Sequence, residues 1–268
     1  MGAELFPHFP KEVAAADAEL GYSIVELCTE DKEGKLGNTE FTQPALFVVN
    51  ALSWLKKLQD GGGKPDFVAG HSLGEYNALF AAGAFDFTTG LKLVKKRGEL
   101  MSKARGGGMA AVVGLPVEKI KETLQAPELS GIDVANYNSP AQFVISGPVD
   151  QIAKSEAALK SAGARNVVVL KVSAAFHSRY MVNSMNEFAS FLSGFRFQTF
   201  EIPVIANVTA RPYQPGDVYD NLARQISSSV LWTDSIRYLL QQPDPHFEEV
   251  GPGMVLTSLI RQIKMATS

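Results

Sequence analysis

The sequence predicts an α/β fold, with a parallel-sheet core of the α/β-hydrolase type that carries an inserted ferredoxin-like subdomain. Strand-like and helix-like segments alternate on both sides of the middle of the chain, which is typical of a parallel sheet. Between them, residues 108–173 show the order βαββαβ, and the triplet Gly106-Gly107-Gly108 marks a hinge where this order begins. We therefore expect a core made of residues 1–107 and 174–268, interrupted by an insert at 108–173.

The core elements follow from periodicity and from helix-start signals. Pro10 begins a helical pattern, and Gln43-Pro44 is expected to open a second helix, whose apolar positions recur at helical spacing. Thr88 or Thr89 is expected to cap a third helix. The predicted core helices are 10–20, 43–59, 75–82, 88–104, 178–193, 217–227, 233–241 and one from 254, and the predicted strands are 66–69, 203–208 and 246–250.

The insert begins with an apolar strand and ends with a β-branched one. Asn138-Ser139-Pro140 reads as a turn between two strands in its centre. The predicted insert strands are 109–115, 131–136, 142–147 and 165–172, and the predicted insert helices are 117–124 and 149–163.

Composition excludes several classes of protein. Apolar residues make up 46% of the 268 and charged residues 20%, and the net charge of −3 gives the chain no general attraction for nucleic acid or an anionic membrane. Its apolar stretches are too short to span a bilayer, and its first residues do not resemble a signal peptide. Cys28 is the single cysteine, which excludes an internal disulfide and favours the cytoplasm. The histidines and this cysteine show no spacing typical of metal ligands.

The pentapeptide Gly70-His71-Ser72-Leu73-Gly74 has the pattern of a nucleophile elbow. An apolar strand is predicted before it and a helix after it, so Ser72 is expected on a sharp strand-to-helix turn. Such a turn exposes the hydroxyl and directs the first amides of the helix toward the group that the hydroxyl attacks.

A serine nucleophile needs a base, and two of the four histidines are candidates. We interpret His71 as structural, because it adjoins the serine, and His8 as a surface residue. His177 follows the insert on a loop of small residues, and His246 begins a predicted late strand.

Two architectures therefore remain open. An α/β-hydrolase triad would use Ser72, then Asp217 or Asp234, then His246, in that order along the chain. A dyad would pair Ser72 with His177 and need no carboxylate. We slightly favour His177, because a loop histidine after small residues less often fills a core.

Arg97 lies on an otherwise apolar helix face with Leu93, Val94, Leu100 and Met101. An arginine in such a place is either paired with an internal carboxylate or available to a substrate carboxylate, which its planar guanidinium can bind through two hydrogen bonds. Position alone favours the internal pair.

Taken together, five motifs resemble the malonyl-CoA:acyl-carrier-protein transacylases, above all the discrete trans-acting acyltransferases of bacterial polyketide synthases. The resemblance covers nearly the whole chain in order. The motifs are GHSLGEY at 70–76, RGELM at 97–101, AFHS at 175–178, PVIANVT at 203–209 and EVGPG at 249–253.

The resemblance implies a role for each matching position. Ser72 would be the nucleophile and His177 its base, while Arg97 would hold the free carboxylate of a malonyl group. The Leu73 amide would donate to the oxyanion, and the backbone carbonyl of Gln225 would orient the histidine in place of a carboxylate. Phe176 matches a residue found where malonyl is preferred over methylmalonyl, and Gln43, Met101, Met109 and Val255 match positions that line or adjoin the site.

One departure concerns the beginning of the chain. The family has an N-terminal strand and a Gly-Gln-Gly-x-Gln loop, whose last glutamine supplies a second oxyanion donor. This sequence begins just after that point, with Met1-Gly2-Ala3-Glu4-Leu5. The expectation is that the sequence is part of a longer one.

The function hypothesis is transfer of malonyl from malonyl-CoA, through a Ser72 ester, to the phosphopantetheine thiol of an acyl carrier protein. No metal or other cofactor is expected, and the pathway, fatty acid or polyketide, is left open. A basic lip that includes Lys95, Lys96 or Arg179 is a candidate docking surface for the acidic carrier. The alternatives are an esterase or acyl-hydrolase and a non-catalytic carrier-binding protein.

Overall fold

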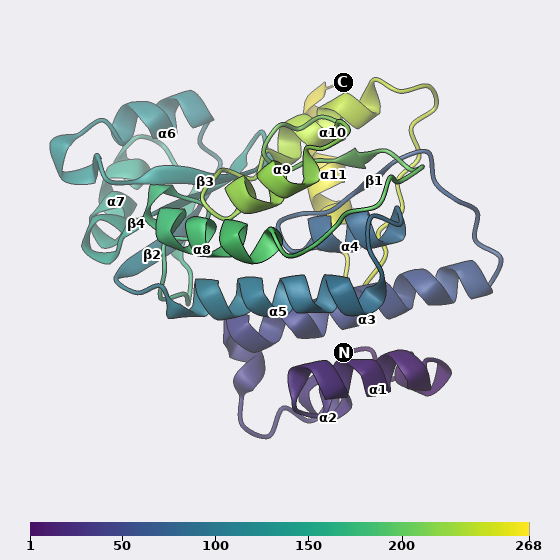
Figure 1. Ribbon diagram of the computed structural model, residues 1–268. Coiled ribbons are helices and arrows are strands. Elements are labelled where there is room, and N and C mark those ends of the chain that lie inside the picture. The colour runs from purple at the N-terminus through teal and green to yellow at the C-terminus, as the bar shows by residue number, and fades with distance from the viewer. Residues whose placement is uncertain (268) are drawn as a thin grey trace.

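The computed structural model describes residues 1–267 and contains two separate sheets. The first is a parallel pair, β1 (Val68–Ala69) and β6 (Val204–Ile205), in which Val68 lies opposite Val204. Helices surround this pair, as Figure 1 shows. The predicted α/β fold is confirmed, although its two core strands are shorter than expected.

Two long helices lie side by side beneath β1: α3 (Thr39–Gln59) and α5 (Phe87–Lys103) (Figure 1). Two glycines on α5 face α3 and its surroundings at close range. A Cβ at Gly98 would lie 3.1 Å from the Thr39 carbonyl oxygen, and one at Gly90 would lie 2.5 Å from the Phe47 ring. The two helices can therefore approach closely only because these side chains are missing.

The starts of both helices differ from the prediction. Asn38 caps α3 by accepting a hydrogen bond from the Glu40 amide at 3.2 Å, so the helix begins one turn early and Pro44 lies inside it. Asp86, not Thr88 or Thr89, caps α5, with its carboxylate accepting from the Thr89 amide at 2.7 Å.

Shorter helices complete the N-terminal part of the core. The predicted helix at 10–20 is confirmed as α1 (Pro10–Leu20), whereas α2 (Ile24–Thr29), capped by Ser23, was not predicted. The helix after the elbow, α4, spans Gly74–Ala81. Three-residue 3₁₀ helices occur at Phe6–His8, Lys35–Gly37, Pro127–Leu129 and Arg179–Met181, the last of which is η4.

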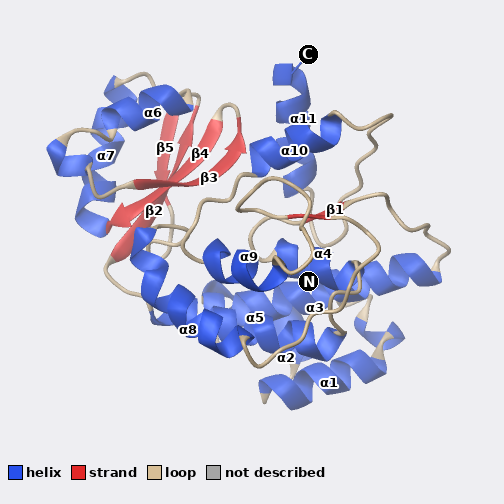
Figure 2. Ribbon diagram, turned by 45° about the horizontal axis from the view of Figure 1, so that its top comes forward, coloured by secondary structure: helices blue, strands red, loops and turns tan. Residues whose placement is uncertain are grey.

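The second sheet belongs to the predicted insert. Its strands β2 (Gly107–Val113), β3 (Asp133–Ser139), β4 (Gln142–Pro148) and β5 (Asn166–Val169) lie in the order β3-β4-β2-β5 and pair antiparallel throughout. This is the ferredoxin-like order that βαββαβ predicts. Helices α6 (Val117–Thr123) and α7 (Val149–Ser161) lie on one side of the sheet (Figure 2), over a separate apolar core. The limits of the insert at 108 and 173 stay a prediction.

After the insert the chain returns to the core through η4 and the helices α8 (Val182–Leu192), α9 (Val218–Gln225), α10 (Trp232–Leu240) and α11 (Val255–Thr267). The prediction of a strand at 246–250 is wrong. Instead, Glu249 caps α11, its carboxylate accepting from the Leu256 and Thr257 amides at 3.1 and 2.8 Å. Within residues 1–267, no helix has the length and apolar character needed to cross a membrane.

Candidate active site

Ser72 lies in the turn between β1 and α4 with a φ of +50°, a left-handed conformation that is strained for a residue with a side chain. Asn207 holds this turn from both sides. Its Oδ1 accepts from the Ser72 amide at 2.7 Å, and its Nδ2 donates to the Gly70 carbonyl at 2.7 Å. A Cβ at Gly70 would lie 2.0 Å from the Gly74 backbone, so this turn requires glycine at position 70.

His177 lies just after the insert in the chain, and its imidazole faces Ser72. Its Nε2 lies 2.8 Å from Ser72 Oγ, and its Nδ1 lies 2.9 Å from the backbone carbonyl oxygen of Gln225. Because a carbonyl oxygen only accepts, Nδ1 carries the proton and Nε2 presents its lone pair to the hydroxyl. The geometry is that of a general base oriented without a carboxylate.

Burial, and next the positive charge of Arg97, lower the pKa of His177 to about 3, so the imidazole is neutral at pH 7. The other candidate base, His246, is exposed on the loop that precedes α11. Asp234 is exposed next to Arg237 on α10, and Asp217 precedes the first residue of α9 without a side-chain capping bond. The structure thus brings His177, and none of the triad candidates, to the serine.

Arg97 extends from α5 into the same cluster and is only 1% exposed. Its Nη2 donates to Ser72 Oγ at 3.0 Å and to Gln225 Oε1 at 2.9 Å, and its Nη1 donates to Gln43 Oε1 at 2.6 Å. Among the described residues, Arg97 forms no ion pair, and its Nε has no hydrogen-bond partner. The expected internal carboxylate partner is therefore absent from direct contact, and amide oxygens take its place.

The other predicted residues divide between this cluster and its surroundings. Gln43 also lies 3.3 Å from Met101 Sδ through its Nε2, and both side chains are buried. Leu73 is the N-cap of α4. Phe176 is half-buried and packs against the cluster that contains Met109. Val255, in contrast, is 68% exposed at the start of α11, and the structure does not bring it into this network.

The sequence reasoning missed a buried carboxylate. Glu75 is fully buried on α4, where it accepts from the Tyr213 hydroxyl and from Gln225 Nε2, each at 2.5 Å. Burial raises the pKa of Glu75 to about 7, against the lowering effect of these bonds and of Arg97. Its place just after the elbow, among apolar residues, was the available signal. Asn207 lies within the motif PVIANVT at 203–209, whereas no sequence signal marked Tyr213.

A groove with a volume of about 520 Å³ is lined in part by His177. One wall is formed by the insert, through Lys121 and Leu124 near α6 and through Asp133, Val134 and Tyr137 on β3. The opposite wall is the loop 227–229, and His177 and Ser178 lie within it. His177, the hydrogen-bond partner of Ser72, therefore lines a groove between the core and the insert.

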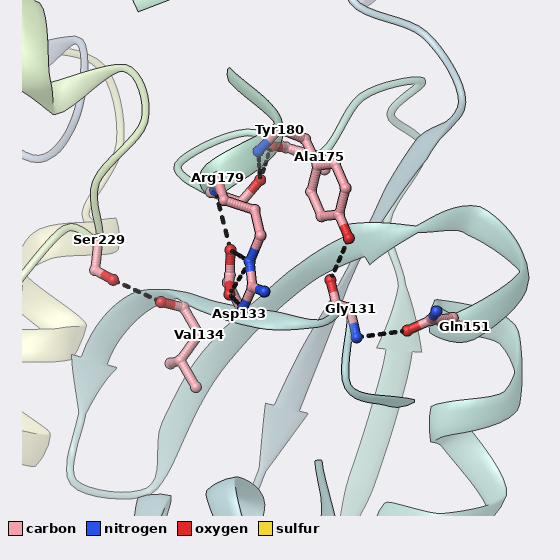
Figure 3. A network of polar contacts seen from close by, with 9 residues as sticks. Gly131, Asp133, Val134, Gln151, Ala175, Arg179, Tyr180 and Ser229 are labelled. Carbon is pink, nitrogen blue, oxygen red and sulfur yellow. Dashed lines mark hydrogen bonds and ion pairs between the residues drawn. The ribbon is translucent and has the colours of Figure 1, made fainter. Parts of the chain in front are cut away.

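Figure 3 shows how the insert is fixed to the loop that carries His177. Arg179 donates from Nε to both carboxylate oxygens of Asp133 at 3.0 Å, and the Tyr180 hydroxyl donates to the Gly131 carbonyl at 2.9 Å. Ser229 Oγ donates to the Val134 carbonyl at 2.7 Å. These bonds hold both walls of the groove together. Of the predicted basic lip, Arg179 is thus bound to Asp133, and Lys95 donates to the Glu19 carbonyl at 2.6 Å.

A serine at an elbow, an imidazole held by a carbonyl and a buried arginine define a class of protein that forms serine esters with acyl groups. The comparisons with known proteins agree. Residues 1–263 match the family described as "Acyl transferase domain", and the chain belongs to this family.

Relatives and solved structures are similar over almost the whole chain. The Bacillus velezensis protein named polyketide biosynthesis malonyl CoA-acyl carrier protein transacylase BaeC is 55% identical over 100% of this chain and 93% of its own. A crystal structure of a malonyl CoA-acyl carrier protein transacylase from Burkholderia pseudomallei has a TM-score of 0.97 and 50% identity, over 100% of this chain and 94% of that one. A malonyl-transacylase in complex with a type II PKS acyl-carrier protein has a TM-score of 0.93 and 34% identity, over 98% of this chain and 88% of that one.

Proposed function

We propose that this acyltransferase moves a malonyl group from malonyl-CoA to the phosphopantetheine thiol of an acyl carrier protein in polyketide biosynthesis. One observation carries the proposal: Nη2 of Arg97, a buried cation without a carboxylate in contact, lies 3.0 Å from Ser72 Oγ. An acyl group esterified to this oxygen therefore has a guanidinium within reach of its far end. A free carboxylate, as malonyl carries, would provide the missing counter-ion. The names of the similar proteins support the substrate, the carrier and the pathway.

In the first half-reaction, Ser72 Oγ attacks the thioester carbonyl of malonyl-CoA while Nε2 of His177 accepts the hydroxyl proton. A C–O bond forms, and the carbonyl oxygen takes the negative charge, stabilised by the Leu73 amide at the start of α4. When the C–S bond breaks, the imidazolium returns its proton to the CoA sulfur. The product is a malonyl ester of Ser72.

In the second half-reaction, the carrier thiol enters through the groove between the insert and the core. His177 accepts the thiol proton as sulfur attacks the ester carbonyl, and Ser72 leaves with that proton. Gln225 keeps Nδ1 protonated through both steps because its carbonyl oxygen only accepts. Chemistry of this kind uses the residues of the chain alone; within residues 1–267, no group of three potential metal ligands is present.

An acyl-hydrolase is the second candidate, because it would use the same serine and histidine. It has no need of a buried arginine next to the nucleophile, and Arg97 therefore favours transfer of a carboxylate-bearing acyl group. We also propose a cytoplasmic location, where a single buried cysteine stays reduced.

The proposal is tested by intact-mass spectrometry after mixing with malonyl-CoA, methylmalonyl-CoA or acetyl-CoA, with and without a holo acyl carrier protein. We expect a malonyl adduct that is lost in Ser72→Ala and His177→Ala but kept in the matched control His246→Ala. The carrier should discharge the adduct and gain the malonyl mass. If water discharges the adduct as fast as the carrier does, the protein is a hydrolase.

A further inference from the structure

Among residues 1–267, Glu75 is the one buried carboxylate that connects to the site, and the proposed chemistry gives it no task. We propose that Glu75 is a positioning residue for Arg97: through the side-chain amide of Gln225, it fixes the guanidinium in the place that selects carboxylate-bearing acyl groups. This inference rests on the proposed function and assigns the selectivity to a residue that does not touch the substrate.

The link consists of two consecutive contacts. Glu75 Oε2 accepts from Gln225 Nε2 at 2.5 Å, and Gln225 Oε1 accepts from Arg97 Nη2 at 2.9 Å. Gln225 Nε2 also donates to the Ser72 carbonyl at 2.9 Å. A carboxylate accepts on both oxygens, so it holds the amide with its nitrogen toward Glu75 and its oxygen toward Arg97.

The surroundings of Glu75 admit a carboxylate but not an amide. Its Oε1 faces two donors, the Asn207 backbone amide at 3.2 Å and the Tyr213 hydroxyl at 2.5 Å. In a Glu75→Gln variant the amide oxygen has to stay at this end, because the Asn207 amide can only donate. The new NH₂ group would then face the NH₂ group of Gln225.

Such a contact of two donors is relieved only if the amide of Gln225 turns over. Its NH₂ group would then face Arg97, which has no acceptor atom, and its oxygen would face the Ser72 carbonyl. Either the guanidinium shifts or a buried polar group loses its hydrogen-bond partner, which is costly at a buried position. The backbone carbonyl of Gln225, which holds His177, does not depend on this turn.

The test compares kcat/KM for malonyl-CoA and for acetyl-CoA, measured as acylation of Ser72. In Glu75→Gln we expect the malonyl-to-acetyl ratio to fall at least tenfold. The KM for malonyl-CoA should rise more than kcat falls, because a carboxylate–guanidinium contact is made in the ground state as well as in the transition state. The matched control Glu99→Gln removes a partly buried carboxylate, paired with Lys96, from the helix of Arg97 and should keep the wild-type ratio.

A double-mutant cycle separates positioning from general damage. In an Arg97→Ala background, Glu75→Gln should change the ratio less than twofold, since the group that it positions is gone. A ratio within threefold of wild type in Glu75→Gln, or an equal drop in both backgrounds, would overturn the inference.

A second variant covers the case in which Glu75→Gln does not fold, as judged by circular dichroism. Tyr213→Phe removes one donor from the carboxylate and should lower the ratio at least threefold; an unchanged ratio in this folded variant would then overturn the inference. Absence of any malonyl adduct on the wild type is a different result, because it rejects the proposed function itself.

Discussion

Replacing Arg97 by alanine tests the central claim about substrate choice. In the proposed malonyl ester the guanidinium binds a carboxylate at a position that is 1% exposed. Removing one partner of a buried, hydrogen-bonded ion pair costs about 3–5 kcal/mol, and each ~1.4 kcal/mol is a factor of ten. We therefore expect kcat/KM for malonyl-CoA to fall about 140- to 3,700-fold, while acetyl-CoA, which lacks the carboxylate, loses far less.

The assay is acylation of Ser72 by each CoA thioester, followed by quenching and intact-mass spectrometry. The truncation also leaves Gln43 Oε1 and Gln225 Oε1 without their donor, at about 1–3 kcal/mol each, so stability will change. The ratio of the two substrates cancels this change, because both are measured on the same folded protein. A malonyl-to-acetyl ratio within threefold of wild type would refute the assignment of Arg97.

Three further predictions concern the elbow, the base and the acyl pocket. Gly70→Ala should lower the free energy of unfolding, measured by thermal denaturation, by more than about 3 kcal/mol, because its Cβ would overlap the backbone at Gly74. The control Gly74→Ala should leave the free energy of unfolding unchanged or raise it slightly, because its Cβ meets nothing within 4 Å. Because the pKa of His177 is lowered from 6.5 to about 3, its imidazole stays neutral to low pH. The rate of Ser72 acylation by a neutral ester should therefore not change between about pH 8 and about pH 5. A fall in this rate centred near pH 6.5 would contradict the prediction. Phe176→Ala should raise methylmalonyl relative to malonyl loading about tenfold by making room for one methyl group, and an unchanged ratio would remove this residue from the pocket.

The fold was predictable where local patterns are strong. The insert is indicated by strand-like and helix-like segments that follow one another in the order βαββαβ. The elbow is indicated because G-x-S-x-G lies between a predicted strand and a predicted helix. Helix starts were less predictable. Pro44 has the sequence signal of a helix start, but α3 begins five residues earlier, at Thr39, where Asn38 caps it.

The site was predictable in its motifs but not in its connections. Ser72, His177 and Arg97 were named from the chain, and the structure brings them together. The contacts of Glu75 with Tyr213 and Gln225 span more than a hundred residues, so no local pattern could indicate them. The prediction of a strand at 246–250 is wrong because the Glu249 carboxylate accepts a hydrogen bond from an amide in the first turn of α11. The alternation of apolar residues does not reveal such a bond.

The close crossing of α3 and α5 has a consequence for the contact between Gln43 and Arg97. Gly98 adjoins Arg97, and the backbone that it faces belongs to the turn just before Gln43. A methyl group at this glycine would push the two helices apart and lengthen the distance between Gln43 Oε1 and Arg97 Nη1, which is now 2.6 Å. The spacing of the two helix backbones therefore sets the separation of Gln43 Oε1 and Arg97 Nη1, so a substitution at Gly98 can change this contact without altering either side chain.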